Sequence, residues 1–102
     1  MRRYDLTPEA QRDIDAIAEY IAIEATVDQA MRVLMELRDA FRKLGDMPGM
    51  GHYREDLLDK RYKFWSVHSY VVVYRWESTP IQIIAVLHGA RDLDAVLSRR
   101  DI

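Results

Sequence analysis

Two N-terminal segments carry apolar residues at helical spacing. In the first, the apolar positions recur every three or four residues and are Ala10, Ile14, Ile17, Ala18 and Ile21. Thr7, Pro8 and Glu9 precede them, as a cap, a residue suited to the first helical position and an acid that complements the helix dipole. The pattern predicts an amphipathic helix after Thr7, with a short strand at Arg3–Leu6 before it.

The helical period breaks at Ala25 and restarts in the second segment. Thr26, with Gln29 three residues later, is typical of a capping box. The predicted core stripe of this helix is Ala30, Val33, Leu34, Leu37, Phe41 and Leu44. Gly45 and the following Pro48–Gly51 segment are expected to end the helix near Leu44. The short connection between the helices predicts an antiparallel hairpin.

Beyond a loop at residues 46–60, where one turn of helix is expected near Glu55–Leu58, the apolar period falls to about 2. The runs rich in β-branched and aromatic residues, each a predicted strand, are Tyr62–Val67, Tyr70–Trp76 and Ile81–Leu87. His68-Ser69 is short enough for a tight hairpin between the first two. We expect the third strand to pair with the second.

The end of the chain predicts one more helix. Gly89 is expected to end the last strand, and Asp92 to cap a short helix ahead of an Arg99-Arg100 tail. Its apolar residues are Leu93, Val96 and Leu97. The fold class is therefore α+β: a short N-terminal strand and a helix hairpin packed on a curved antiparallel sheet, in the order β-α-α-β-β-β, with a short C-terminal helix. We expect two layers in one domain, residues 1–102.

Composition narrows the function classes. Apolar residues make up 49% of the chain and charged residues 31%, as in globular proteins. The apolar run Tyr70–Tyr74 is too short to span a bilayer, and Asp5, Pro8 and Glu9 stand where a signal peptide needs apolar residues. We therefore expect a cytoplasmic protein without membrane association.

The chemistry available to the chain is limited. It has no cysteine, and its histidines, His52, His68 and His88, are too far apart in sequence for a metal motif. We expect no metal and no cofactor. The net charge of −2 argues against a broad nucleic-acid surface, because phosphate contacts call for basic residues. Direct, specific DNA binding by this chain is not expected.

Four local patterns, in order, resemble the ParE branch of the RelE/ParE toxins. They are Leu6-Thr7-Pro8-Glu9-Ala10 with Asp13-Ile14, Pro48-Gly49-Met50-Gly51, Tyr70-Val71-Val72-Val73-Tyr74-Arg75, and Val86-Leu87-His88-Gly89-Ala90-Arg91-Asp92-Leu93. The resemblance covers nearly the whole chain. It implies a toxin of a type II toxin–antitoxin pair that inhibits DNA gyrase by binding it, without a catalytic site. A cognate antitoxin would neutralise it in a heteromeric complex, a heterotetramer or larger.

The alternative branch contains ribosome-dependent mRNA endonucleases. On this interpretation the catalytic residues would be Lys63, His88 and Arg91, yet Trp65 and Val71 stand where further basic residues would be expected. The segment after residue 91 also lacks a tyrosine or histidine. His88 could pair with Glu55 or Arg91, or simply end its strand. A non-toxic relative that binds only its antitoxin is a third possibility.

Two sets of surface residues are candidates for contact with partners. At about 100° per residue, Met31 and Met35 point away from the core stripe of the second helix, and Ile23 does the same near the end of the first. We predict that these three bind the antitoxin, against the alternative of scattered surface hydrophobes. Arg91, Arg99 and Arg100 are the predicted target contacts. The basic cluster Arg54, Lys60, Arg61 and Lys63 is interleaved with acids, which indicates a solvated face.

Overall fold

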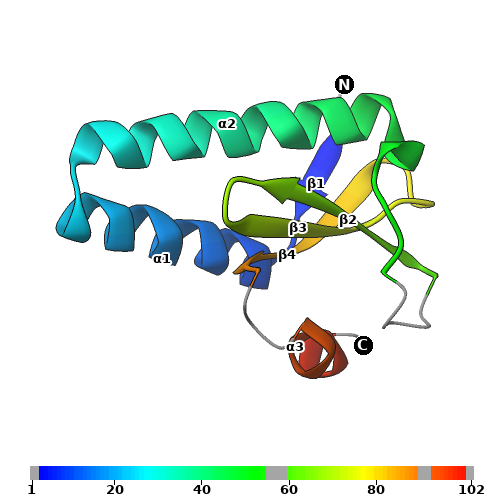
Figure 1. Cartoon of the computed structure of the whole chain (residues 1–102). Helices are drawn as coiled ribbons and strands as arrows, with labels where there is room; N and C mark the ends of the chain where they lie inside the picture. Colours follow the sequence, from blue (N-terminus) through cyan, green and yellow to red (C-terminus); the bar gives the residue numbers. More distant parts are fainter. Residues whose placement is uncertain (1–2, 55–59, 90–92, 101–102) are drawn as a thin grey trace.

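The computed structural model describes residues 3–54, 60–89 and 93–100. In chain order the elements are β1 (Tyr4–Leu6), α1 (Pro8–Glu24), α2 (Val27–Asp46), the 3₁₀ turn η1 (Pro48–Met50), β2 (Tyr62–Val67), β3 (Tyr70–Arg75), β4 (Ile81–His88) and α3 (Leu93–Arg100). The predicted α+β order is confirmed, with the two long helices forming a hairpin over the sheet (Figure 1). The helical turn expected near Glu55–Leu58 and the Asp92 cap fall on residues outside those described.

Both predicted helix starts are confirmed by capping hydrogen bonds. The Thr7 hydroxyl accepts from the backbone N–H of Ala10 at 3.1 Å. The Thr26 hydroxyl accepts from the N–H of Gln29 at 3.0 Å. Each bond satisfies one of the N–H groups that the first turn of a helix leaves without a partner.

The prediction that Gly45 ends the second helix is wrong. The helix continues to Asp46, and the N–H of Met47 closes it by donating to the carbonyl of Lys43 at 2.9 Å. Gly45 instead lies in the last turn, against the backbone of Arg3. A Cβ at this position would lie 2.5 Å from the Arg3 carbonyl oxygen, so glycine is needed for close approach rather than for a cap.

The four strands form one sheet in the order β1-β4-β3-β2. The meander β2-β3-β4 is antiparallel, as expected, but β1 lies parallel to β4, which makes the sheet mixed. A register shift between Val73 and Tyr74 of β3 places a bulge in the ladder with β4. Both long helices, β2 and β3 lie between β1 and β4 in the chain. Local sequence could therefore not specify that β1 and β4 pair.

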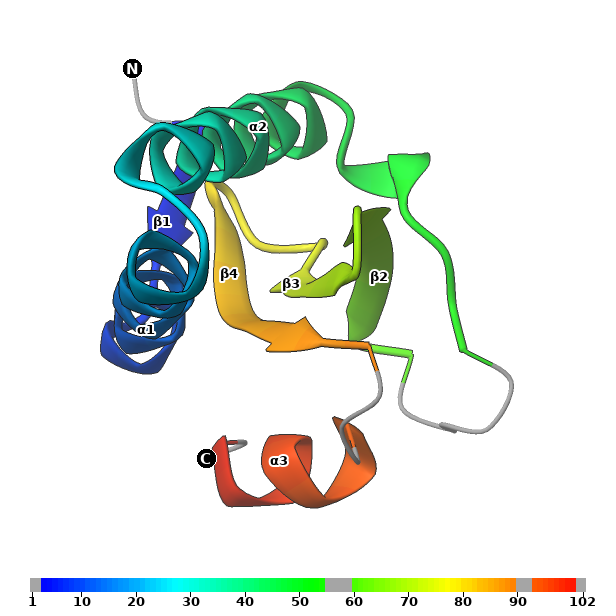
Figure 2. The same cartoon turned by 60° about the vertical axis from the view of Figure 1, so that its left-hand side comes forward.

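The helix hairpin covers one face of the sheet and α3 covers the other (Figure 2). The first core joins most of the buried residues of the two long helices to Val72, Tyr74, Ile83 and Val86. The second joins Leu93, Val96 and Leu97 of α3 to strand residues such as Phe64 and Val73. The expected two-layer arrangement therefore missed a third layer, formed by α3. This layer is needed because β4 is buried almost throughout and must be covered on both faces.

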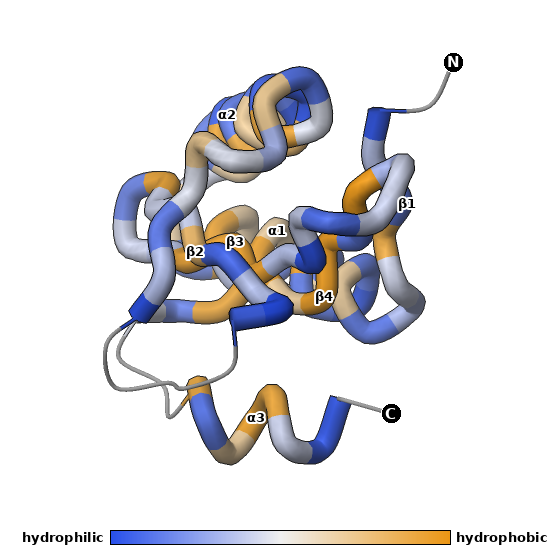
Figure 3. The backbone as a smooth tube through the Cα atoms, turned by 90° about the vertical axis from the view of Figure 1, so that its right-hand side faces the viewer, coloured by the Kyte–Doolittle hydropathy of each residue, from blue (hydrophilic) through white to orange (hydrophobic). Residues whose placement is uncertain are grey.

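The distribution of hydropathy follows these two cores. In Figure 3 the helices α2 and α3 alternate between hydrophilic and hydrophobic residues along their length. Of the predicted α2 stripe, Ala30, Leu37, Phe41 and Leu44 are buried, while Val33 and Leu34 are half-buried. The expected Arg99-Arg100 tail belongs to the last turn of α3, which carries the helix to Arg100.

Candidate functional site

The helix hairpin presents a set of large apolar side chains to solvent. The exposed fractions of the three predicted contact residues are 71% for Ile23, 54% for Met31 and 63% for Met35, so their outward orientation is confirmed. Tyr20 and Val27 are exposed to a similar extent and were not predicted. Grouped exposure of this kind is typical of a surface that contacts a partner.

The exposed residues of α2 form a continuous seam. Val27, Met31 and Met35 are each four residues apart and therefore lie on one face of the helix. Arg38 follows Met35 by three residues and Arg42 follows Arg38 by four, so both basic residues lie on the same side of the helix, beyond the apolar part of the seam. Val27 could have been found from the sequence by extending the four-residue spacing back from Met31.

Tyr20 lies between two hollows at the sides of α1. One, of about 380 Å³, is lined by residues of both long helices, among them Arg32 and Glu36, and by His68 of the β2–β3 turn. The other, of about 430 Å³, lies between α1 and the strands and is lined by Tyr70 and His88. His68 is in contact with the Glu36 carboxylate, which ties the turn to α2.

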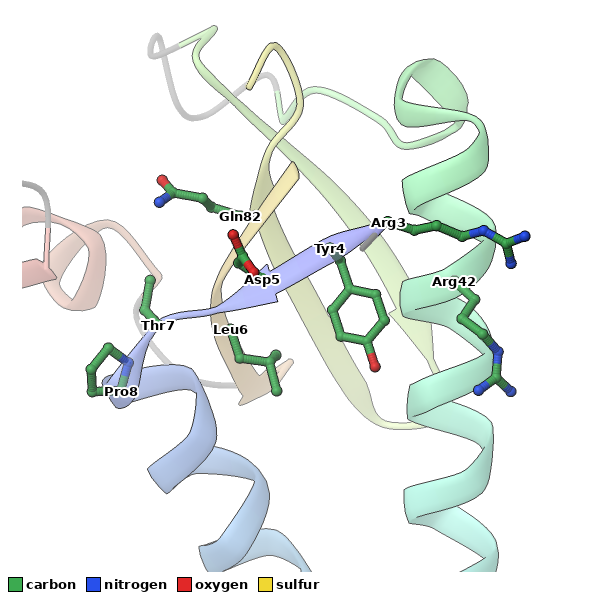
Figure 4. A pocket seen from close by; sticks show the side chains of 8 residues that line it. All are labelled: Arg3, Tyr4, Asp5, Leu6, Thr7, Pro8, Arg42 and Gln82. Carbon is green, nitrogen blue, oxygen red and sulfur yellow. The ribbon is translucent and has the colours of Figure 1, made fainter. Parts of the chain in front are cut away.

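A third hollow lies beside β1, which is an edge strand (Figure 4). Tyr4 and Leu6 point toward the helices, whereas Arg3 and Arg42 extend outward on the same side (Figure 4). Arg3 pairs with Asp46 at 3.0 Å and Arg42 pairs with Asp39, and both pairs are exposed. Exposed ion pairs of this kind contribute little to stability.

Lys63 and His88, the two described residues of the endonuclease alternative, lie at different places along the sheet. In the sheet register, Lys63 lies opposite Tyr74 and His88 lies opposite Tyr70. These two positions of β3 are about 13 Å apart along the strand. His88 is exposed at the end of β4, with its ring edge-on to that of Tyr70. Arg91 and Glu55 lie outside the described residues. Acid–base catalysis on one phosphate requires its groups within hydrogen-bonding distance of the substrate, and Lys63 and His88 are too far apart along the sheet to act together in this way.

Lys63 is the most buried charged residue in the described part of the chain, at 8% exposure. Its ammonium lies 4.1 Å from the ring centre of Tyr53 and 4.9 Å from that of Trp76. It also donates a long hydrogen bond, 3.4 Å, to the carbonyl of Gly51. The sequence indicated a solvated basic face here, and for Lys63 that interpretation is wrong, because the aromatic rings enclose it.

The segment around Gly51 is fastened to the sheet by Tyr74. Its hydroxyl donates to the carbonyl of Pro48 at 2.6 Å and accepts from the N–H of Gly51 at 3.0 Å. Burial raises the pKa of Tyr74, and the hydrogen bond from Gly51 partly opposes this by lowering it. The phenol therefore stays neutral at physiological pH and acts as a structural bridge.

The predicted target contacts have different surroundings. Arg99 is exposed on the last turn of α3, and Arg91 lies outside the described residues. The guanidinium of Arg100 is held by both carboxylate oxygens of Asp13, at 2.5 and 2.9 Å, with only 19% and 12% of the two side chains exposed. The hydrogen bonds to Asp13 raise the pKa of Arg100, so it remains charged. This geometry favours a structural role for Arg100.

Metal chemistry has no evident site in the described residues. Among residues 3–54, 60–89 and 93–100, no three acidic or histidine side chains gather as metal ligands would. None of the helices in these three ranges is long and apolar enough to cross a membrane.

Fold and surface together define the class, a small α+β protein with an apolar face on its helix hairpin. Residues 4–93 match the family model described as ParE toxin of type II toxin-antitoxin system, parDE. The chain belongs to this ParE toxin family. It is 33% identical over 97 residues to Toxin ParE1 of Caulobacter vibrioides, covering 95% of this chain and 99% of the relative.

A solved structure of the chromosomal ParDE TA system from P. aeruginosa has the same fold, with a TM-score of 0.71. The two chains are 16% identical, and the match covers 83% of this chain and 92% of the other. The resemblance noted in the sequence is therefore confirmed at the level of the family. This protein is a ParE-type toxin of a type II toxin–antitoxin system.

Proposed function

We propose that this toxin acts by binding a second protein, DNA gyrase, and that a cognate antitoxin neutralises it by covering the helix hairpin. Membership in the ParE family is the observation that carries this proposal. Binding would block gyrase and trap cut DNA without covalent chemistry from the toxin. Two observations of the site support a binder over an endonuclease, namely the burial of Lys63 and its separation from His88.

The antitoxin surface is proposed to centre on Ile23, Met31 and Met35, extended by Tyr20 and Val27. Unbranched methionine side chains adapt to the shape of a partner, and their exposure leaves apolar area to be buried on binding. A heterotetramer or larger complex would follow from an antitoxin that dimerises and binds DNA through its own second part. The similarity to a chain of the P. aeruginosa ParDE system supports a partner of this kind.

Gyrase inhibition is tested by adding purified, antitoxin-free protein to a supercoiling reaction. We expect lost supercoiling together with double-strand breaks that rise in proportion to the toxin. If gyrase is unaffected by protein that still binds its antitoxin, the gyrase target is wrong. Cleavage of mRNA on ribosomes by the same preparation would instead support the endonuclease.

The antitoxin surface is tested with Met35→Glu. A charge placed in the apolar seam should weaken antitoxin affinity by about 2 kcal/mol, or roughly thirtyfold, because the carboxylate is desolvated on binding. Met47→Glu is the matched control, since Met47 is also 63% exposed but lies at the far end of α2. An affinity for Met35→Glu within twofold of the wild type would remove Met35 from the interface.

A further inference from the structure

The ammonium of Lys63 lacks a counter-ion among the described residues. It contacts the rings of Tyr53 and Trp76 and the Gly51 carbonyl, and no described carboxylate forms an ion pair with it. A hydrogen bond of 3.4 Å is weak, and an ammonium has three donors to satisfy.

Holding this charge costs folding free energy. Taking an ammonium out of water without an opposite charge costs more free energy than a cation–π contact returns. Lys63 has two such rings and no described carboxylate beside it. A carboxylate from a ligand would supply the opposite charge that the described residues do not.

The walls of the site are held in place before any ligand arrives. Gly51 is fixed by the Tyr74 hydroxyl, and His52 exchanges two backbone hydrogen bonds with Phe64, at 2.9 and 2.8 Å. The Trp76 indole N–H donates to the carbonyl of Lys60 at 3.2 Å. A site that is already organised gains more affinity per contact, because less conformational entropy is lost on binding.

The site opens to solvent on the side of Tyr53. Tyr53 is 41% exposed and lies outside the helices and strands, so its ring forms the outer wall of the site. A second ammonium, that of the exposed Lys60, lies 4.5 Å from the centre of the same ring. Two cations on one aromatic ring concentrate positive potential at the entrance.

We propose that Lys63, Tyr53 and Trp76 form a binding site for an acidic side chain of a protein partner. A single ammonium enclosed between aromatic rings matches one carboxylate. A buried pair of opposite charges would make the interface specific for a partner with an acid at that place. A nucleic-acid strand would need a track of phosphate contacts, which a chain of net charge −2 does not favour. The proposal rests on the proposed mode of action, in which the toxin works by gripping another protein.

The proposal is tested by titrating the protein with a glutamate hexapeptide. Binding is monitored by NMR through the indole ¹H–¹⁵N signals of Trp65 and Trp76, the two tryptophans of the chain. We expect a saturable shift of the Trp76 signal in the antitoxin-free protein, with roughly tenfold weaker binding in Lys63→Met. Lys43→Met, a change at an exposed lysine on α2, should bind like the wild type. No shift in the wild type, or equal shifts in both variants, would overturn the proposal. So would a larger response to a thymidine hexanucleotide.

Thermal unfolding of Lys63→Met separates this role from a structural one. If Lys63 is kept for a ligand, the apolar variant should unfold at the same temperature as the wild type or higher. A lower unfolding temperature would mean that the ammonium stabilises the fold, and the proposal would fail. Because the peptide titration does not involve gyrase, failure of the gyrase target and failure of this site give different results.

Discussion

At the scale of single residues, close packing rather than chain conformation explains the glycines that matter. Gly51 touches the Tyr74 hydroxyl so closely that a Cβ would lie 2.3 Å from it. Gly49, two residues earlier, has open space where a Cβ would be built. The same 3₁₀ turn and its exit thus contain one glycine required by a neighbour and one that is not.

This contrast predicts the outcome of two matched substitutions. Gly51→Ala should destabilise the protein by about 1–3 kcal/mol, because the Tyr74 ring must shift and lose its hydrogen bonds. Gly49→Ala should change the free energy of unfolding by less than about 1 kcal/mol, and toward stability if the backbone fits alanine. Urea denaturation of both variants measures this difference, and equal destabilisation would contradict it.

Tyr74 should make stability fall in strongly alkaline solution. Its pKa is raised in the folded state from the ordinary value of 10.0, so the unfolded chain loses the proton first. The stabilising contribution is therefore fully present below pH 10 and is lost as the pH rises through the folded pKa. Unfolding measured from about pH 8 to 11 should show a smaller alkaline loss in Tyr74→Phe, which removes this proton. Parallel curves for the two proteins would show that Tyr74 is not responsible.

At the scale of elements, an ion pair joins α3 to the rest of the fold in addition to its apolar face. Asp13 of α1 binds Arg100 and also accepts from the N–H of Val86 at 3.0 Å, next to the bulge in the β3–β4 ladder. Arg100 donates in turn to the Ile84 carbonyl at 3.3 Å. One carboxylate therefore connects α1, β4 and α3.

Breaking this connection should loosen α3. Arg100→Met is expected to cost about 2–3 kcal/mol, between the values typical of exposed and buried pairs, because Asp13 is left half-enclosed without this partner. Arg99→Met, one residue earlier and exposed, is the control and should be neutral in stability. Thermal unfolding compares the two. If Arg99→Met also retains full toxicity, Arg99 is not a target contact.

The same contact changes how a C-terminal truncation must be interpreted. Removing residues 98–102 would remove Arg100 together with the exposed Arg99. Lost toxicity could then result from a detached helix rather than from a missing target contact. The single substitutions separate these causes, since only one of them disturbs the ion pair with Asp13.

At the scale of the whole molecule, the two proposed binding surfaces lie on different elements. The antitoxin surface is on α1 and α2, whereas Lys63 lies on β2, the edge strand at the opposite end of the sheet from β1. A substitution in one surface should therefore leave binding at the other surface unchanged.

We therefore expect a double dissociation. Met35→Glu should lose antitoxin affinity while it still arrests growth, because its target surface is intact. Lys63→Met should keep antitoxin affinity but lose growth arrest by roughly tenfold in the dose required. Antitoxin titration and induced expression in cells measure the two effects. Coupled losses in both variants would indicate a single shared surface or a folding defect.

Patterning along the chain was sufficient to predict the elements and much of the exposed face. Local signals are strong there: Thr7 and Thr26 cap helices through bonds three residues away, and helical spacing alone turns Met31 and Met35 outward. Four ordered motifs also indicated the family, because their order and spacing can be recognised without knowledge of the fold.

Contacts between distant residues, by contrast, could be found only in the folded molecule. The parallel pairing of β1 with β4, the second core under α3 and the Asp13–Arg100 pair each join segments far apart in the chain. Gly45 was expected to be a helix stop and proved to be a point of close approach to Arg3. Lys63 was expected to be solvated and proved to be enclosed by rings from two other segments. Periodicity indicates which way a side chain points, whereas burial and charge pairing depend on what the fold brings against it.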